Sequence, residues 1–150
     1  MFLKDVFVLK QKETDKLLKA LKTDAELSEI MSKHEDAFLN GVLSEELKRL
    51  LEKKQITRRS LIKASLLNEV YFYQILNGRK RPHRNKLLCI TIAMQLTVDE
   101  TQELLKVTGY AALYPRLPQD YIIIYGIERG MDVTKINELL FEHGFSLLTE

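Results

Sequence analysis

The side chains best suited to specific recognition lie between residues 69 and 74, where Glu69, Val70, Tyr73 and Gln74 share one face of an expected helix. A carboxylate can accept a hydrogen bond from the amino group of cytosine, and an amide can pair with adenine through two hydrogen bonds. An aliphatic side chain can pack on the methyl group of thymine. This short face therefore carries groups that could contact the edges of bases.

Cations surround this face in the sequence. Residues 52–86 contain ten basic and two acidic side chains, an excess of eight positive charges in a chain whose net charge is only +2. The other residues carry an excess of six negative charges. A basic segment framed by acidic ones suits a protein that meets a polyanion on one face. An ordinary solvated surface rich in Lys and Arg is the alternative, and the charge pattern leaves it open.

Two short helices, predicted over residues 57–65 and 68–77, would position these groups. Asn68 is a good N-cap for the second helix, and Gly78 is expected to end it. The apolar contacts that would lock the second helix across the first come from Leu61, Leu67, Phe72 and Ile75. Beyond Gly78 the chain leaves as a basic, extended segment that ends at Pro82.

Helical periodicity dominates the rest of the chain and predicts an all-α protein. The candidate segments are residues 12–22, 24–37, 44–54, 57–65, 68–77, 84–95, 98–108, 119–129 and 132–143. Thr23 with Glu26 and Thr97 with Glu100 are predicted capping boxes, and Ser44 is a predicted N-cap. Residues 6–9 fit a helix or a strand, whereas residues 122–124 are expected to lie in a buried helix.

A weak internal repeat has an offset of 35 residues. Residues 87–113 align without gaps on residues 122–148, with seven identities. Thr97 and Asp132 are both expected to be N-caps, and Gly109 and Gly144 are both expected to end a helix in a left-handed conformation. The alternative is a chance similarity between two amphipathic helix pairs. If the repeat is real, residues 119–148 form a second helix pair that packs against the first.

The composition argues against several classes of protein. Cys89 is the single cysteine, the three histidines are far apart, and no phosphate-binding loop, zinc-protease motif or nucleophile elbow is present. We therefore expect no catalytic residues, no metal site and no cofactor, so the protein is not expected to be an enzyme. No apolar run approaches a bilayer span and no secretion signal opens the chain, which predicts a cytoplasmic protein without membrane contact.

The segment from Thr57 to Pro82 resembles the helix-turn-helix of the XRE family, the lambda repressor and Cro type of transcriptional regulator. Leu61, Leu67, Phe72 and Ile75 match the buried positions of that motif, and Gly78 to Pro82 match its exit. Leu47, Leu50 and Leu51 match the first helix of the family, and Leu87, Leu88, Ile90 and Ala93 match the fourth. Two positions depart from the family: Leu66 stands where Gly is usual, at a cost of about 1 kcal/mol if the residue is left-handed, and Ile62 replaces a small Ala.

The resemblance implies a five-helix DNA-binding domain at residues 41–110, an N-terminal helical arm at residues 1–40 and a C-terminal helix pair at residues 111–150. It implies base contacts by Glu69, Val70, Tyr73 and Gln74, and phosphate contacts by Arg58, Asn77, Arg79, Lys80, Arg81 and Arg84. The expected partners are double-stranded DNA and a second copy in a homodimer. The C-terminal helices are the expected dimer surface or a surface for another protein.

An adaptor that kept the scaffold but binds an acidic protein instead of DNA is the alternative. Glu69, an anionic residue on the face that would meet DNA, is the feature that favours it.

Overall fold

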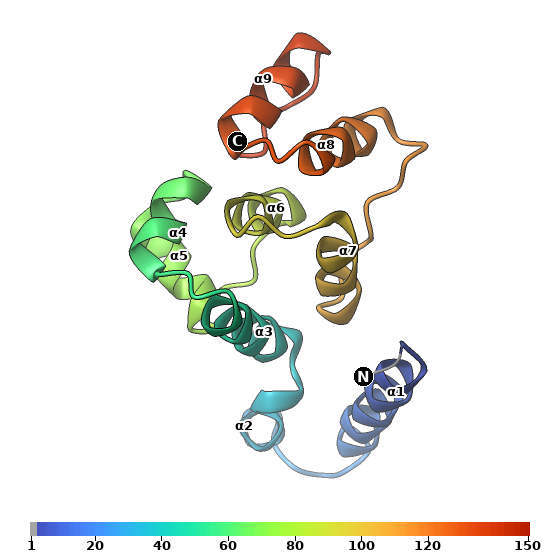
Figure 1. The fold of residues 1–150 in the computed structure, drawn as a ribbon. Helices are drawn as coiled ribbons and strands as arrows, with labels where there is room; N and C mark the ends of the chain where they lie inside the picture. Colours follow the sequence, from blue (N-terminus) through green and yellow to red (C-terminus); the bar gives the residue numbers. More distant parts are fainter. Residues whose placement is uncertain (1–2) are drawn as a thin grey trace.

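The computed structural model describes residues 3–150, which form nine α-helices and one short 3₁₀ helix, with no strand among them (Figure 1). The helices are α1 (Leu3–Ala20), α2 (Leu27–Lys33), η1 (Glu35–Ala37), α3 (Leu39–Lys53), α4 (Arg58–Ser65), α5 (Glu69–Leu76), α6 (Arg84–Ala93), α7 (Val98–Val107), α8 (Pro118–Glu128) and α9 (Val133–Glu142). The all-α prediction is confirmed for this part of the chain. None of these helices has the length and apolar character needed to cross a membrane.

One hydrophobic core joins α3 to α9. Its buried side chains form a single cluster that extends from Leu43 to Leu148. Within it, α3 packs on α5, α4 packs on α6, α6 packs on α9, and α8 packs on α7 and α9. The side chains that the sequence predicted to lock the two helices are buried, as are the first-helix leucines. Burial of such side chains contributes about 1.5–3 kcal/mol each, which makes this cluster the main source of stability.

The N-terminal helices lie outside this core, at the opposite end of the molecule from α8 and α9 (Figure 1). No residue from Lys10 to Val42 is buried. Lys10 reaches α7 through a hydrogen bond from its ammonium group to the carbonyl oxygen of Lys106, but a groove of about 1090 Å³ separates α1 from α3 and α7. Residues 6–9 are helical, so the choice between helix and strand is resolved as helix.

Two predicted helix caps and one predicted helix are wrong. Ser44 does not cap a helix, because α3 begins at Leu39 and Ser44 is buried within it, where its hydroxyl donates to the carbonyl oxygen of Leu76 at the end of α5. Thr23 does not form a capping box, because its hydroxyl donates to the carbonyl oxygen of Ala20 and the next helix begins only at Leu27. The segment predicted as one helix over residues 24–37 is divided into α2 and η1.

The backbone repeats at the predicted offset of 35 residues. Helices α7 and α9 have equal length and start 35 residues apart, and their N-caps Thr97 and Asp132 accept hydrogen bonds as expected. Both predicted left-handed glycines have positive φ, 84° at Gly109 and 80° at Gly144.

Side-chain bonds repeat as well. The Gln102 side-chain oxygen accepts from the Leu113 amide at 2.7 Å, and the Asn137 side-chain oxygen, 35 residues later, accepts from the Leu148 amide at 2.8 Å. Each amide side chain thus ties the segment after its helix back onto that helix. The segments that follow α7 and α9 are therefore fixed by the same kind of side-chain hydrogen bond.

Candidate nucleic-acid interface

Helices α4 and α5 are held in a fixed turn by local hydrogen bonds. The Asn68 side chain accepts from the Tyr71 amide at 3.2 Å, which confirms Asn68 as the N-cap of α5. In the turn before it, the buried Ser65 hydroxyl donates to the Ile62 carbonyl oxygen and accepts from the Leu67 amide. Leu66 is left-handed, with φ 61° and ψ 14°. A leucine therefore adopts the conformation that glycine usually supplies at this turn, at a cost of about 1–2 kcal/mol.

The inner face of α5 packs on the hydrophobic core. Phe72, Ile75 and Leu76 are buried, and α5 packs on α3. The outer face is therefore presented on a rigid support, because a helix whose inner side chains are locked in a close-packed core has little freedom to rotate.

The four residues predicted to contact bases fall into two pairs. Glu69 and Val70, at the start of α5, are exposed, and Val70 leaves 66% of its surface open to solvent. Tyr73 and Gln74, one turn further on, are half-buried. The Tyr73 ring lies edge-on to Phe72 at a centroid distance of 5.8 Å, so part of that side chain belongs to the core. The structure brings all four onto one short helix, with its N-terminal end the most open.

The end of α5 shapes the basic exit. Gly78 has φ 76°, and the amides of Arg79 and Lys80 both donate to the carbonyl oxygen of Gln74. The prediction that Gly78 ends the second helix is confirmed. This turn folds the chain back against the last turn of α5, so Asn77 and the exposed Arg79 and Lys80 lie close to the C-terminal end of the candidate base-contact face.

Several cations are available on this surface. Arg58 at the start of α4, Arg79 and Lys80 are exposed, and none of them belongs to an ion pair among the described residues. The Lys80 ammonium lies 5.9 Å from the centre of the Tyr71 ring. Arg59 and Lys63 on α4 are also exposed. They belong to the basic segment of residues 52–86, but no contact was predicted for them. An unpaired surface cation keeps its full charge for a phosphate group.

Two of the predicted phosphate contacts have other partners. Arg81 donates to the carbonyl oxygen of Thr108 at 2.8 Å, and its guanidinium carbon lies 4.1 Å from the centre of the Tyr110 ring. Its side chain is therefore directed to the segment that follows α7.

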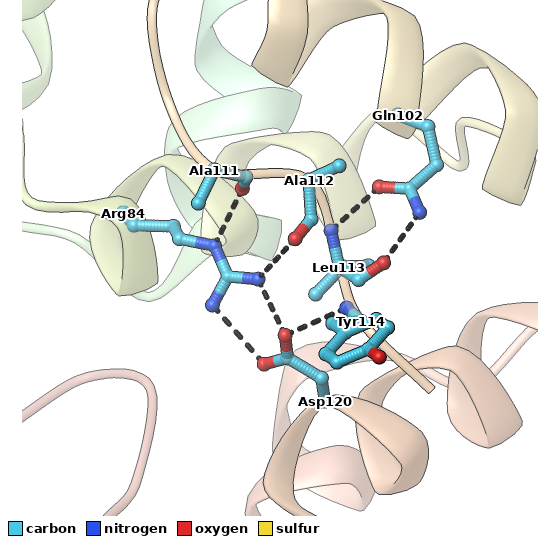
Figure 2. A network of polar contacts seen from close by, with 7 residues as sticks. All are labelled: Arg84, Gln102, Ala111, Ala112, Leu113, Tyr114 and Asp120. Carbon is cyan, nitrogen blue, oxygen red and sulfur yellow. Dashed lines mark hydrogen bonds and ion pairs between the residues drawn. The ribbon is translucent and has the colours of Figure 1, made fainter. Parts of the chain in front are cut away.

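Arg84 is occupied more completely (Figure 2). Its guanidinium forms a two-pronged ion pair with Asp120 on α8, at 2.7 and 3.1 Å, and donates to the carbonyl oxygens of Ala111 and Ala112. Every nitrogen of the group has a partner inside the protein. We therefore leave Arg84 out of the candidate interface and assign it to the link between α6 and α8.

The partner of Arg84 was not foreseen. Asp120 lies 36 residues further along the chain and is buried, with its second oxygen also accepting from the Tyr114 amide at 2.9 Å. The one available signal was an acidic residue in an otherwise apolar segment, which is typical of a buried ion pair.

The described residues do not meet the requirements of a metal site or of a reactive thiol. They contain no group of three or more His, Cys, Asp or Glu side chains that could hold a metal ion. Burial raises the pKa of the Cys89 thiol to about 11. No protein-family model matches this chain, and neither a curated protein nor a solved structure matches it.

Proposed function

We propose that this protein is a sequence-specific DNA-binding transcriptional regulator of the XRE type that places α5 in the major groove. In this proposal α3 to α7 form the five-helix DNA-binding domain of the lambda repressor type, and residues 3–37 form an arm outside it. The observation that carries the proposal is the exposed face of α5, which is fixed by an N-cap and a buried inner face and is flanked by unpaired cations.

The dimensions and charge of this surface support the proposal. An α-helix with its side chains is about 10–12 Å wide and fits the major groove, which is about 12 Å wide. Arg58 lies at the start of α4 and Arg79 and Lys80 follow the end of α5, so exposed cations precede and follow the helix that would enter the groove along the chain. Phosphate contacts fix the position of a protein on DNA, and base contacts supply the selectivity.

Glu69 and Val70 lie at the most exposed end of α5, where recognition helices of this kind contact bases. Gln74 can pair with adenine, and Tyr73 contributes with the part of its ring that is exposed. One such domain makes few contacts, so the proposal includes a homodimer that reads two half-sites about one helical turn apart.

The test is fluorescence anisotropy of the purified protein with DNA selected from a randomised pool, measured over a series of salt concentrations. Replacing Gln74 with Ala is expected to reduce the preference for the selected sequence by roughly 5- to 150-fold, the equivalent of about 1–3 kcal/mol for a good base contact. Arg79→Ala is expected to weaken binding to all sequences and to lower the slope of log K against log salt by about 0.9.

Lys135→Ala is the matched control, because Lys135 is an exposed cation on α9, far from the candidate interface along the chain. It is expected to change neither the selectivity nor the slope. If no sequence is enriched, or if Arg79→Ala and Lys135→Ala change the salt slope equally, the proposal is wrong.

The second candidate is an adaptor that binds an acidic protein through the same basic surface. The exposed carboxylate of Glu69 on the outer face of α5 is the observation that favours it. That carboxylate also has a local structural reason, because an anion in the first turn of a helix gains about 0.3–1 kcal/mol from the helix dipole. Selection of a DNA sequence in the experiment above would exclude the adaptor as the sole function.

A further inference from the structure

The outer face of α8 is apolar and has no partner in the described chain. Leu117, Tyr121 and Tyr125 follow one another at intervals of four residues and expose 52%, 61% and 42% of their surfaces. They lie opposite the buried face of the helix, where α9 packs so closely that a Cβ atom on Gly126 would come within 2.4 Å of the Ile136 side chain. The stripe is therefore not the core-facing side of α8, because the opposite side of the helix already packs on α9.

Charges are missing from this stripe and present at both of its ends. Asp120 is the one charged residue from Leu117 to Ile127, and it is buried, in a chain of which 29% is charged. Arg116 precedes the stripe and Glu128 ends it, both exposed. An apolar centre rich in tyrosine with a charged rim is the usual composition of a protein interface.

We infer that the α8 stripe, defined as Leu117, Tyr121 and Tyr125, binds the same stripe of a second copy of this chain, with the two helices antiparallel. A twofold axis near Tyr121 would place Leu117 of each copy against Tyr125 of the other. The same axis would bring Glu128 of each copy toward the segment of the other that contains Arg116. Opposite charges of the rim therefore meet across the axis, Arg116 of one copy with Glu128 of the other. This complementarity favours a second copy over an unrelated protein.

The remaining cation at this rim does not oppose the pairing. The Arg129 guanidinium is folded back along its own helix, 3.6 Å from the centre of the Tyr125 ring, and donates to the Tyr125 carbonyl oxygen. Stacking on Tyr125 keeps it beside its own chain, so Glu128 is the rim residue left to meet Arg116 of the second copy.

The area of the stripe indicates a weak dimer. Each half-exposed side chain of the stripe, together with the neighbouring Tyr114, can bury on the order of 100 Å². This gives roughly half of the 800 Å² per partner that a standard interface buries. We therefore expect a dissociation constant in the micromolar range.

The exposed apolar residues of the N-terminal arm are a poorer candidate surface. Leu18 and Leu21 on α1 and at its end alternate with Lys16, Lys19 and Lys22. Pairing two such surfaces would bring like charges together, whereas the one cation of the described chain that contacts the α8 stripe, Arg129, lies at its end and is stacked on Tyr125.

The inference supplies the surface for the homodimer in the proposed function, and it is tested without DNA. Sedimentation velocity of the full chain over roughly 1–200 μM protein should show a monomer–dimer equilibrium. Tyr121→Arg should shift it to monomer over the whole range. Phe141→Arg is the matched control, because Phe141 is even more exposed, at 74%, but lies on α9. It should leave the dimer unchanged, and equal urea midpoints will show that both variants are folded.

The charged rim gives a second test that does not depend on Tyr121. Arg116→Glu and Glu128→Lys should each weaken self-association by roughly tenfold, because each places like charges at both ends of the pair. An equimolar mixture of the two variants should recover a dimer close to the wild type in strength, because opposite charges meet again in the heterodimer.

A wild-type chain that stays monomeric up to about 200 μM, or a Tyr121→Arg variant that dimerises like Phe141→Arg, would overturn the inference. Failure of the mixture to recover would overturn the antiparallel arrangement on which the inference depends. Because no DNA is present, loss of the dimer here and absence of DNA selection in the previous experiment are separate results.

Discussion

Removal of the Asp120 carboxylate should reveal how strongly the α6 and α8 helices are linked. The Asp120 side chain is only 5% exposed and that of Arg84 is 25% exposed. Asp120→Ala removes two ion-pair hydrogen bonds and the acceptor for the Tyr114 amide, and it leaves the Arg84 charge without its partner (Figure 2).

The expected loss follows from this geometry. Breaking a buried ion pair from one side costs about 3–5 kcal/mol. Arg84 keeps its bonds to two carbonyl oxygens and some contact with water, so we expect the lower end, about 3 kcal/mol. Domains of this size have unfolding free energies of about 5–15 kcal/mol, so the variant should remain folded and measurable.

The assay is urea denaturation followed by circular dichroism. Asp120→Asn is the matched comparison, because it keeps the size of the side chain and one acceptor oxygen, and it should lose less stability than Asp120→Ala. The double variant Arg84→Met with Asp120→Ala should lose less unfolding free energy than the two single variants lose together. The expected difference is about 1–3 kcal/mol. A loss below about 1 kcal/mol for Asp120→Ala would refute the assignment of Arg84 to this link.

Three further predictions test individual groups. Leu66→Gly should raise the free energy of unfolding by about 0.5–1 kcal/mol in urea denaturation, because glycine adopts the left-handed conformation without the cost that leucine has; an unchanged or lower value would show that the Leu66 contacts outweigh the strain. The hydrogen bond from the Thr97 amide, assisted by Lys54, lowers the pKa of Glu100, so Glu100 stabilises the fold above its unfolded-state pKa and this contribution is lost as the pH falls through the lower folded-state pKa. Glu100→Gln should therefore be less stable than the wild type at pH 7, and thermal denaturation at falling pH should show the difference shrinking; a difference independent of pH would exclude the charge as its cause. Because the buried Cys89 thiol has a pKa raised to about 11, its reaction with a thiol reagent at pH 7 should occur only when the protein unfolds, and rapid labelling of the native protein would contradict its burial.

The features predicted correctly from the sequence are those that depend on residues close together along the chain. Asn68 and Thr97 cap their helices because the amides that they bind are three residues away, so the pattern contains both partners. Gly109 and Gly144 end their helices because a left-handed residue is a local requirement. The inner face of α5 was predictable as well, since apolar spacing alone determines which side of a helix is buried.

The wrong or missed features depend on distant partners. Ser44 has the type and position of an N-cap, but in the structure its hydroxyl binds the end of α5, 32 residues away, and α3 extends one turn further toward the N-terminus. Arg84 belongs to a basic segment that matches phosphate contacts of a known family, but Asp120 holds it within the protein. A local sequence pattern shows which side-chain groups are present. It does not show which group from a distant part of the chain will bind them in the folded protein.

The links between helices also predict how the proposed regulator would read DNA. Helix α4 packs on α6, α6 packs on α9, and the Arg84 pair connects the start of α6 to α8. The α8 stripe is therefore held at a fixed orientation to α5 through one close-packed core. A dimer formed through this stripe should accept only one spacing between half-sites, because no flexible linker lies between the dimer surface and the recognition helix. Insertion of two or five base pairs between the half-sites should abolish the gain in affinity of a double site over a single one. Undiminished affinity for the altered spacings would exclude a rigid dimer through the α8 stripe and would direct the search to the N-terminal arm, where no residue from Lys10 to Val42 is buried.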